Sequence, residues 1–153
     1  MISYKNSKKI LKKAIIKIKN ENILSINSLN RVSSSNIYSN FNYPAGDNAA
    51  FDGYAINSND TKDIKKNKSK VFKIIGTIAA GKKPFKKQVN KYKTVEIMTG
   101  GIIPKGFDTI IPIEQIKFYP NKKIQKFIII NKKIGKYNHV RFAGSDFKKN
   151  ELV

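Results

Sequence analysis

Two aspartates in one short stretch are the first candidates for a functional site in this chain. Asp47-Asn48 and Asp52-Gly53 stand five residues apart in a chain that has only ten acidic residues. The Asp-Gly step favours a turn, so we expect Asp52 at the end of a loop, before a strand over 54–56. A carboxylate in such a place could orient water or a ligand. Two side chains that only cap turns are the structural alternative.

Thr99 is the second candidate, because it ends an expected strand and is followed by two glycines. Gly100 and Gly101 would let the backbone come close to a ligand. The hydroxyl of Thr99 and the N–H groups of both glycines could donate to an anionic oxygen. An ordinary strand end with a glycine turn is the alternative.

Arg141 and Asp146 flank a glycine turn and form the third candidate. They could form an ion pair that stiffens the turn, or the guanidinium could bind a phosphate. His139 is the only histidine, and no second ligand stands at metal-binding spacing from it. We therefore expect no metal site within these residues.

The composition limits the class of protein. A length of 153 residues suits one domain, or two small sub-domains that share a core. No apolar run approaches the roughly 20 residues that span a bilayer, and the lysine-rich start does not resemble a signal peptide. Without cysteine there is no disulfide and no thiolate chemistry. These features favour a cytoplasmic protein with no membrane partner.

The net charge of +21 suggests a polyanion partner at first sight. However, the chain has only two arginines, Arg31 and Arg141, and its lysines are spread over the whole length. Lysine cannot make the bidentate contacts with which arginine binds bases and phosphates. The pattern favours a solvated lysine-rich surface over a nucleic-acid interface, with some remaining attraction for small anionic substrates.

The apolar pattern predicts an α+β fold. A helix is expected from Ser7 to Lys19, with Ser7 as its cap, because apolar residues recur there at helical spacing. An irregular crossover over 20–42 follows, and 61–70 reads as an exposed lysine-rich loop.

The second half of the chain has the pattern of strands. Runs of β-branched and aromatic residues occur at 71–75, 92–97, 108–113 and 124–130. A turn at 119–121 would join the strand before it to 124–130 as a hairpin. The expected architecture is one amphipathic helix, a crossover and a mostly antiparallel β-domain.

Taken in order, these segments resemble the MoeA and gephyrin family of molybdopterin molybdenumtransferases. Residues 47–55 are similar to the family's Asp-Asn-Ser-Ala-Met-Asp-Gly-Tyr-Ala, and 97–114 to its Ile-Met-Thr-Gly-Ala run. Further similarities occur at 29–32, at 80–81 and at 141–146, where the family has Arg-x-x-Gly-Glu-Asp. The resemblance is collinear over nearly the whole chain.

The resemblance implies an enzyme that inserts molybdate into adenylylated molybdopterin and releases AMP. It implies that Asp52 and Thr99 are the catalytic residues of this region. The remaining matched positions would bind substrate or form the cleft: Asp47, Asn48, Gly53, Gly100, Arg141 and Asp146.

The resemblance also implies how the chain is organised. Residues 1–46 would form a helical dimerisation segment of a homodimer, to which an incomplete 138–153 returns, and 47–137 would form a β-rich linker domain. We expect no counterpart of the family's molybdopterin-binding C-terminal domain within these residues. The family's Mg²⁺ would be bound in that C-terminal domain.

Three departures bear on this interpretation. Ala49 replaces a serine, Glu96 stands where the family usually has a basic residue, and Ser145 replaces a glutamate. Two other interpretations therefore stay open: a small basic β-domain that binds nucleic acid or another polyanion, and a truncated inactive remnant.

Overall fold

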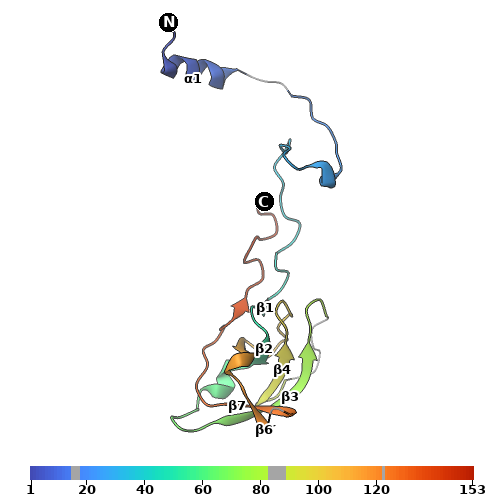
Figure 1. Cartoon of the computed structure of the whole chain (residues 1–153), viewed down its shortest axis with the longest axis vertical. Helices are drawn as coiled ribbons and strands as arrows, with labels where there is room; N and C mark the ends of the chain where they lie inside the picture. Colours follow the sequence, from blue (N-terminus) through green and yellow to red (C-terminus); the bar gives the residue numbers. More distant parts are fainter. Residues whose placement is uncertain (15–17, 83–88, 122) are drawn as a thin grey trace. The chain divides into compact units, whose positions relative to one another are not determined.

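The computed structural model divides into two compact units, Met1–Ile37 and Tyr38–Val153, each described here by itself (Figure 1). It describes residues 1–14, 18–82, 89–121 and 123–153. The first unit holds helix α1, Tyr4–Lys13, and the short 3-10 helix η1, Ser25–Asn27. The predicted boundary after residue 46 is not tested by this division and stays a prediction. Within the described ranges, no helix is long and apolar enough to cross a membrane.

Helix α1 begins earlier and ends earlier than the sequence pattern predicts. Ser3 is the N-cap, and its hydroxyl oxygen accepts the N–H of Asn6 at 3.4 Å. Ser7, predicted as the cap, lies inside the helix and donates its hydroxyl to the Ser3 carbonyl at 3.1 Å. The predicted end at Lys19 is wrong, because Ala14 has extended backbone and caps the helix. Residues 15–17 of the predicted helix lie outside the described residues.

The second unit is built on one sheet of six strands. The order across it is β5 (Thr109–Pro112), β2 (Gly53–Ile56), β4 (Lys93–Ile97), β3 (Lys70–Ile78), β7 (Ile124–Ile130) and β6 (Lys117–Asn121). All neighbours are antiparallel except β3 and β4, which are parallel. The prediction of an α+β chain with a mostly antiparallel β-domain is confirmed.

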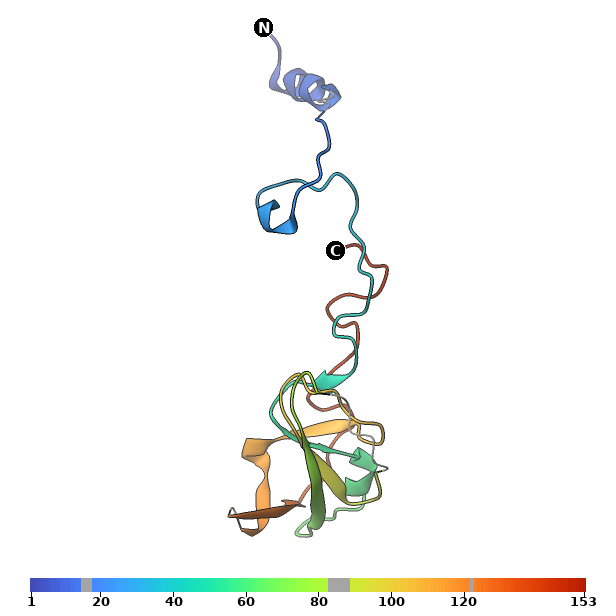
Figure 2. The ribbon, with the colours of Figure 1, turned by 90° about the vertical axis from the view of Figure 1, so that its right-hand side faces the viewer.

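Two short strands and two 3-10 helices complete this unit. They are β1 (Asn48–Ala49), β8 (Val140–Arg141), η2 (Ser58–Thr61) and η3 (Ile113–Gln115). Strands β1 and β8 pair with each other. The segment before β1 and the segment after β8 run antiparallel up to a bridge between Tyr38 and Leu152, and in Figures 1 and 2 they lie side by side.

The expected hairpin of β6 and β7 is present, but its turn is not where the sequence suggests. Tyr119 and Pro120 lie inside β6, and the register shifts between them. Strand β6 is at the edge of the sheet. A proline is tolerated in an edge strand, because no further strand needs its missing N–H. The predicted turn at 119–121 is therefore wrong.

The expected exposed loop over 61–70 also has a buried member. Thr61 is fully buried at the end of η2. Its hydroxyl donates to the carbonyl of Ser58 at 2.8 Å and accepts the N–H of Ile134 at 3.0 Å. A polar side chain can be buried here because both of these bonds are made.

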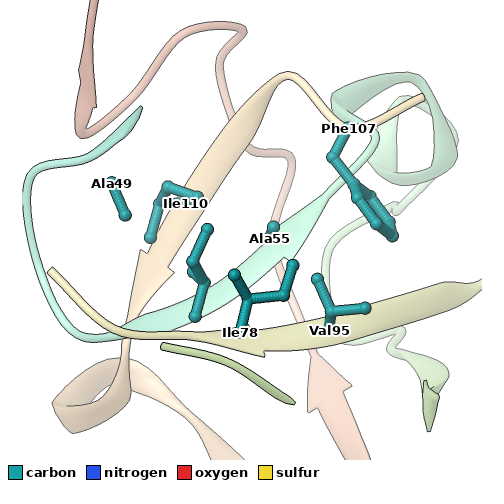
Figure 3. Packing of buried hydrophobic residues seen from close by; sticks show 7 residues of the cluster. Ala49, Ala55, Ile78, Val95, Phe107 and Ile110 are labelled. Atoms are coloured by element: carbon teal, nitrogen blue, oxygen red, sulfur yellow. The ribbon is translucent and has the colours of Figure 1, made fainter. Parts of the chain in front are cut away.

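Strand β2 separates two apolar clusters. Successive side chains of a strand point to opposite faces. Ala55 packs in one cluster, whose side chains converge in Figure 3, and Tyr54 and Ile56 pack in the other. All four residues of β2 are buried. Burial raises the pKa of Tyr54 to about 12, with a smaller contribution from the negative charge of Glu96.

Gly53 provides a direct test of how tightly β2 is held. A Cβ at Gly53 would lie 2.1 Å from the carbonyl oxygen of Ile111, so Gly53→Ala must displace backbone. We expect a loss of about 3 kcal/mol or more in the free energy of unfolding. Gly46→Ala is the matched control, since its Cβ would meet only the Ile102 side chain at 3.4 Å. It should change stability by less than about 1 kcal/mol. Equal denaturation midpoints for the two variants would contradict the close approach.

Candidate functional site

Asp52 lies directly before the first residue of strand β2. The backbone carbonyl of Asp52 accepts the N–H of Ile113 at 3.1 Å. The next residue, Gly53, pairs with Ile97 on one side and with Pro112 on the other. The backbone from the Asp52 carbonyl into Gly53 is therefore tied to both neighbouring strands, while the Asp52 side chain stays exposed.

The carboxylate of Asp52 is held by Thr99. Its Oδ1 accepts the backbone N–H of Thr99 at 2.6 Å and the Thr99 hydroxyl at 2.7 Å. These bonds favour the charged form and lower the pKa of Asp52, the backbone bond most and the hydroxyl bond next. The two residues that the resemblance marks as catalytic are thus in direct contact.

This arrangement defines what Asp52 can do chemically. Among the described residues, Thr99 donates two hydrogen bonds to Oδ1 of Asp52, and no residue donates to Oδ2. Oδ2 can therefore accept a hydrogen bond from water or a ligand. Because a low pKa makes the carboxylate a weak base, it is suited to orienting a donor rather than to storing a proton.

The two glycines after Thr99 serve the fold in this structure. Gly100 has φ of 78° and donates its N–H to the carbonyl of Ala49 at 2.8 Å. Gly101 donates its N–H to the carbonyl of Met98 at 2.8 Å. The expected anion would therefore have to displace a backbone hydrogen bond at either glycine. The Thr99 hydroxyl likewise donates to Asp52, so its proton is not available to a separate anion in this structure.

A second group of predicted residues gathers around β1 and β8. Arg141 donates to the carboxylate of Asp146, which lowers the pKa of Asp146 and raises that of Arg141. Oδ1 of Asp47 accepts the N–H of Ala143 at 2.9 Å. The structure thus shows the ion pair that stiffens the turn, the first of the two roles considered for Arg141.

Strand β1 links the two groups. Asn48 is buried and pairs with Arg141, and it also forms a bridge with Ile102. The next residue, Ala49, exchanges backbone hydrogen bonds with the glycine turn that follows Thr99. The eight predicted residues therefore form two neighbouring groups, one around Asp52 and one around Arg141.

One contact of the Asp52 loop has no signal in the sequence. The Phe51 ring meets the His139 ring edge to face, with centroids 5.0 Å apart. The carbonyl of His139 also accepts the N–H of Ala50 at 3.0 Å. Phe51 and His139 are far apart in the chain, so no local pattern of residues predicts that they meet.

A pocket near Asp47 is a further feature that the sequence does not reveal. Its volume is about 420 Å³, and Lys105, Asp108 and Lys136 are among the residues that line it with Asp47. The Asp108 carboxylate is already engaged, since it accepts the N–H and the hydroxyl of Ser58. In the part of the chain that the structure describes, no group of three or more metal-ligating side chains occurs.

Comparison with known proteins gives consistent matches. The family model described as the MoeA N-terminal region, domains I and II, matches residues 2–153. The chain is 27% identical over 152 residues to a molybdopterin molybdenumtransferase of Staphylococcus epidermidis, covering 99% of this chain and 35% of that protein. It is 33% identical over 125 residues to the enzyme of Haemophilus influenzae, covering 81% of this chain and 28% of that protein.

The fold gives the same result. The crystal structure of a molybdopterin biosynthesis MoeA protein from Pyrococcus horikoshii OT3 matches with a TM-score of 0.71 at 31% identity. The match covers 80% of this chain and 31% of that one. The chain thus spans about a third of the length of the relatives that it matches.

The two bonds from Thr99 to Asp52 can be separated by substitution. Thr99→Val removes the hydroxyl donor and keeps the N–H, so the pKa of Asp52 should rise and still stay below the ordinary 3.8. Thr99→Ser keeps both donors and should leave the pKa unchanged. A carboxyl ¹³C NMR titration measures these values, and an unchanged pKa in Thr99→Val would contradict the hydroxyl bond.

The sign of the linked stability effect follows from the same shift. Because folding lowers the pKa of Asp52, its contribution to stability is present above the ordinary value of 3.8 and is lost as the pH falls through the folded value. Thr99→Val should make that acid-induced loss smaller.

Proposed function

Because the chain belongs to the MoeA N-terminal region family, we propose that it forms the N-terminal and linker part of a molybdopterin molybdenumtransferase. Such an enzyme inserts molybdate into adenylylated molybdopterin and releases AMP. The observation that carries the proposal is the exposed Asp52 carboxylate, which is held by Thr99 in the turn that follows β4.

Asp52 would act as a charged acceptor in this reaction. With Oδ1 fixed by Thr99, Oδ2 is available to accept a hydrogen bond from the group that attacks the phosphoanhydride, and so to orient it. Its lowered pKa keeps Asp52 anionic at neutral pH. Thr99 is then a positioning residue, since it touches the reacting groups through Asp52.

The Mg²⁺ that the family implies does not fit the residues described here. Mg²⁺ takes near-octahedral oxygen ligands and is often bound by one or two carboxylates together with substrate phosphates. Around Asp52 the described residues provide one uncommitted carboxylate oxygen and no cluster of ligands. We therefore derive no step through the metal, and its site would belong to another part of the enzyme.

The proposal includes a homodimer formed through the N-terminal region. Within Met1–Ile37, several large apolar side chains are more than 70% exposed, including Leu24, Ile26, Leu29 and Val32. A second copy could cover such side chains and bury their apolar area. A sedimentation mass of one chain at micromolar concentration would contradict this part of the proposal.

Activity can be tested in the longest natural protein that contains these 153 residues. Asp52→Asn keeps the shape and removes the charge, so kcat for AMP release should fall about 100-fold with little change in KM. Thr99→Val should lower kcat by roughly tenfold, and Thr99→Ser should restore most of the loss, because the serine hydroxyl can replace that of threonine.

Asp63→Asn serves as the matched control. The Asp63 side chain is 88% exposed, and its ion pair with Lys70 is loose, at 4.0 Å. It should leave AMP release unchanged. The proposal is wrong if Asp52→Asn and Thr99→Val both retain full activity. Residues 1–153 as the only protein should release no AMP from adenylylated molybdopterin.

A further inference from the structure

One face of the sheet carries side chains that neither apolar cluster uses. The register places Val71, Ile129 and Lys117 side by side across β3, β7 and β6. A second row, two residues along, contains Lys73, Phe127 and Tyr119. Directly opposite residues in paired strands point to the same face, so these six form one continuous surface, here called the lysine-aromatic face.

The apolar members of this face are open to solvent. Val71 is 44% exposed and Tyr119 is 50% exposed, while Phe127 and Ile129 are half-buried. The alternate residues of the same strands point the other way and form the core: Phe72, Phe118 and Ile128. The lysine-aromatic face is therefore a second apolar surface on strands whose core packing is already complete.

Its charge is of one sign. Lys73 and Lys117 lie on the face, and Lys93 stands next to Lys73 on the parallel neighbour β4. None of the ten acidic residues of the chain belongs to β3, β6 or β7. The lysines therefore have no carboxylate among these strands, and a partner that covers the face would have to bring acidic groups.

The side chains favour a polypeptide over a nucleic acid. The rings of Tyr119 and Phe127 meet edge to face, with centroids 6.3 Å apart and planes at 65°. They do not offer the successive open ring faces on which unpaired bases stack. The other row presents the aliphatic side chains of Val71 and Ile129, which are suited to contact with apolar side chains of a polypeptide. A second copy docked through this same face would set Lys73 and Lys117 against the same lysines, and like charges repel.

We propose that the lysine-aromatic face docks an acidic, amphipathic segment of a partner protein. Its apolar side chains would cover Val71, Ile129 and Tyr119, and its carboxylates would pair with Lys73 and Lys117. The apolar contacts supply affinity by burial, and the charge pairs set orientation and selectivity. This proposal does not depend on the enzymatic function proposed above.

The test uses the 153-residue chain at physiological salt with a fluorescent peptide of alternating Glu and Leu. The double variant Lys73→Glu/Lys117→Glu should bind it roughly tenfold more weakly, which is about 1.4 kcal/mol. Tyr119→Ser, outside both core clusters, should weaken binding by a similar factor. The control Lys8→Glu/Lys9→Glu makes the same change in net charge on exposed lysines of α1, and it should alter affinity less than about twofold. Unchanged melting curves confirm that each variant is folded.

Three results would overturn the proposal. The first is equal weakening by both lysine pairs, which would mean attraction by net charge alone. The second is equal binding of a peptide of alternating Glu and Ser, which would remove any role for apolar contact. The third is tighter binding of oligothymidylate that is lost in Tyr119→Ser, which would make the face a nucleic-acid surface.

Discussion

The close approach of the Gly53 backbone to the carbonyl oxygen of Ile111 constrains the centre of this protein. Only a residue without a side chain fits there, and its fit lets β2 pair with β4 and β5 at once. With both sides paired and both faces buried, β2 has little freedom. The residue just before it, Asp52, is fixed in space although its carboxylate is in solvent.

The charge of Asp52 is controlled locally. In a chain with a net charge of +21, general attraction to the many lysines is the first cause to consider for a low pKa. The causes are instead the two bonds from Thr99, which aim a backbone N–H and a hydroxyl at one oxygen. Such bonds act at contact distance and are less sensitive to salt than charges spread over a surface. The lysines of the lysine-aromatic face are not among the causes of the low pKa of Asp52. Their charge can therefore serve the partner proposed above.

The sequence predicts the elements whose pattern is local. The strands of the sheet follow β-branched and aromatic runs, and the hairpin of β6 and β7 was expected. The errors come from competing local signals: Ser3 caps α1 in place of Ser7, and Pro120 is tolerated within an edge strand. Thr61 is buried because its hydroxyl bonds a backbone group far along the chain, which hydropathy does not register.

In the candidate site, too, the sequence marks single residues but not the contacts between them. Residue types and order mark Asp52 and Thr99 separately, but spacing alone does not show that one holds the other. That contact exists because β2 and β4 are neighbours, which only the fold determines. The pairing of β1 with β8 and the contact of Phe51 with His139 also join distant segments. A single sequence carries no local signal for any of them.

The hold of Thr99 on Asp52 can be measured by amide hydrogen exchange, because the exposed Thr99 N–H is protected only if the Asp52 carboxylate binds it. We expect slow exchange of the Thr99 amide at neutral pH, and exchange at the rate of a free amide when Asp52 is replaced by alanine. The Gly100 amide, which donates to the Ala49 carbonyl, should stay protected in both proteins. Fast exchange of Thr99 in the unaltered chain would mean that the Asp52 carboxylate does not bind this N–H.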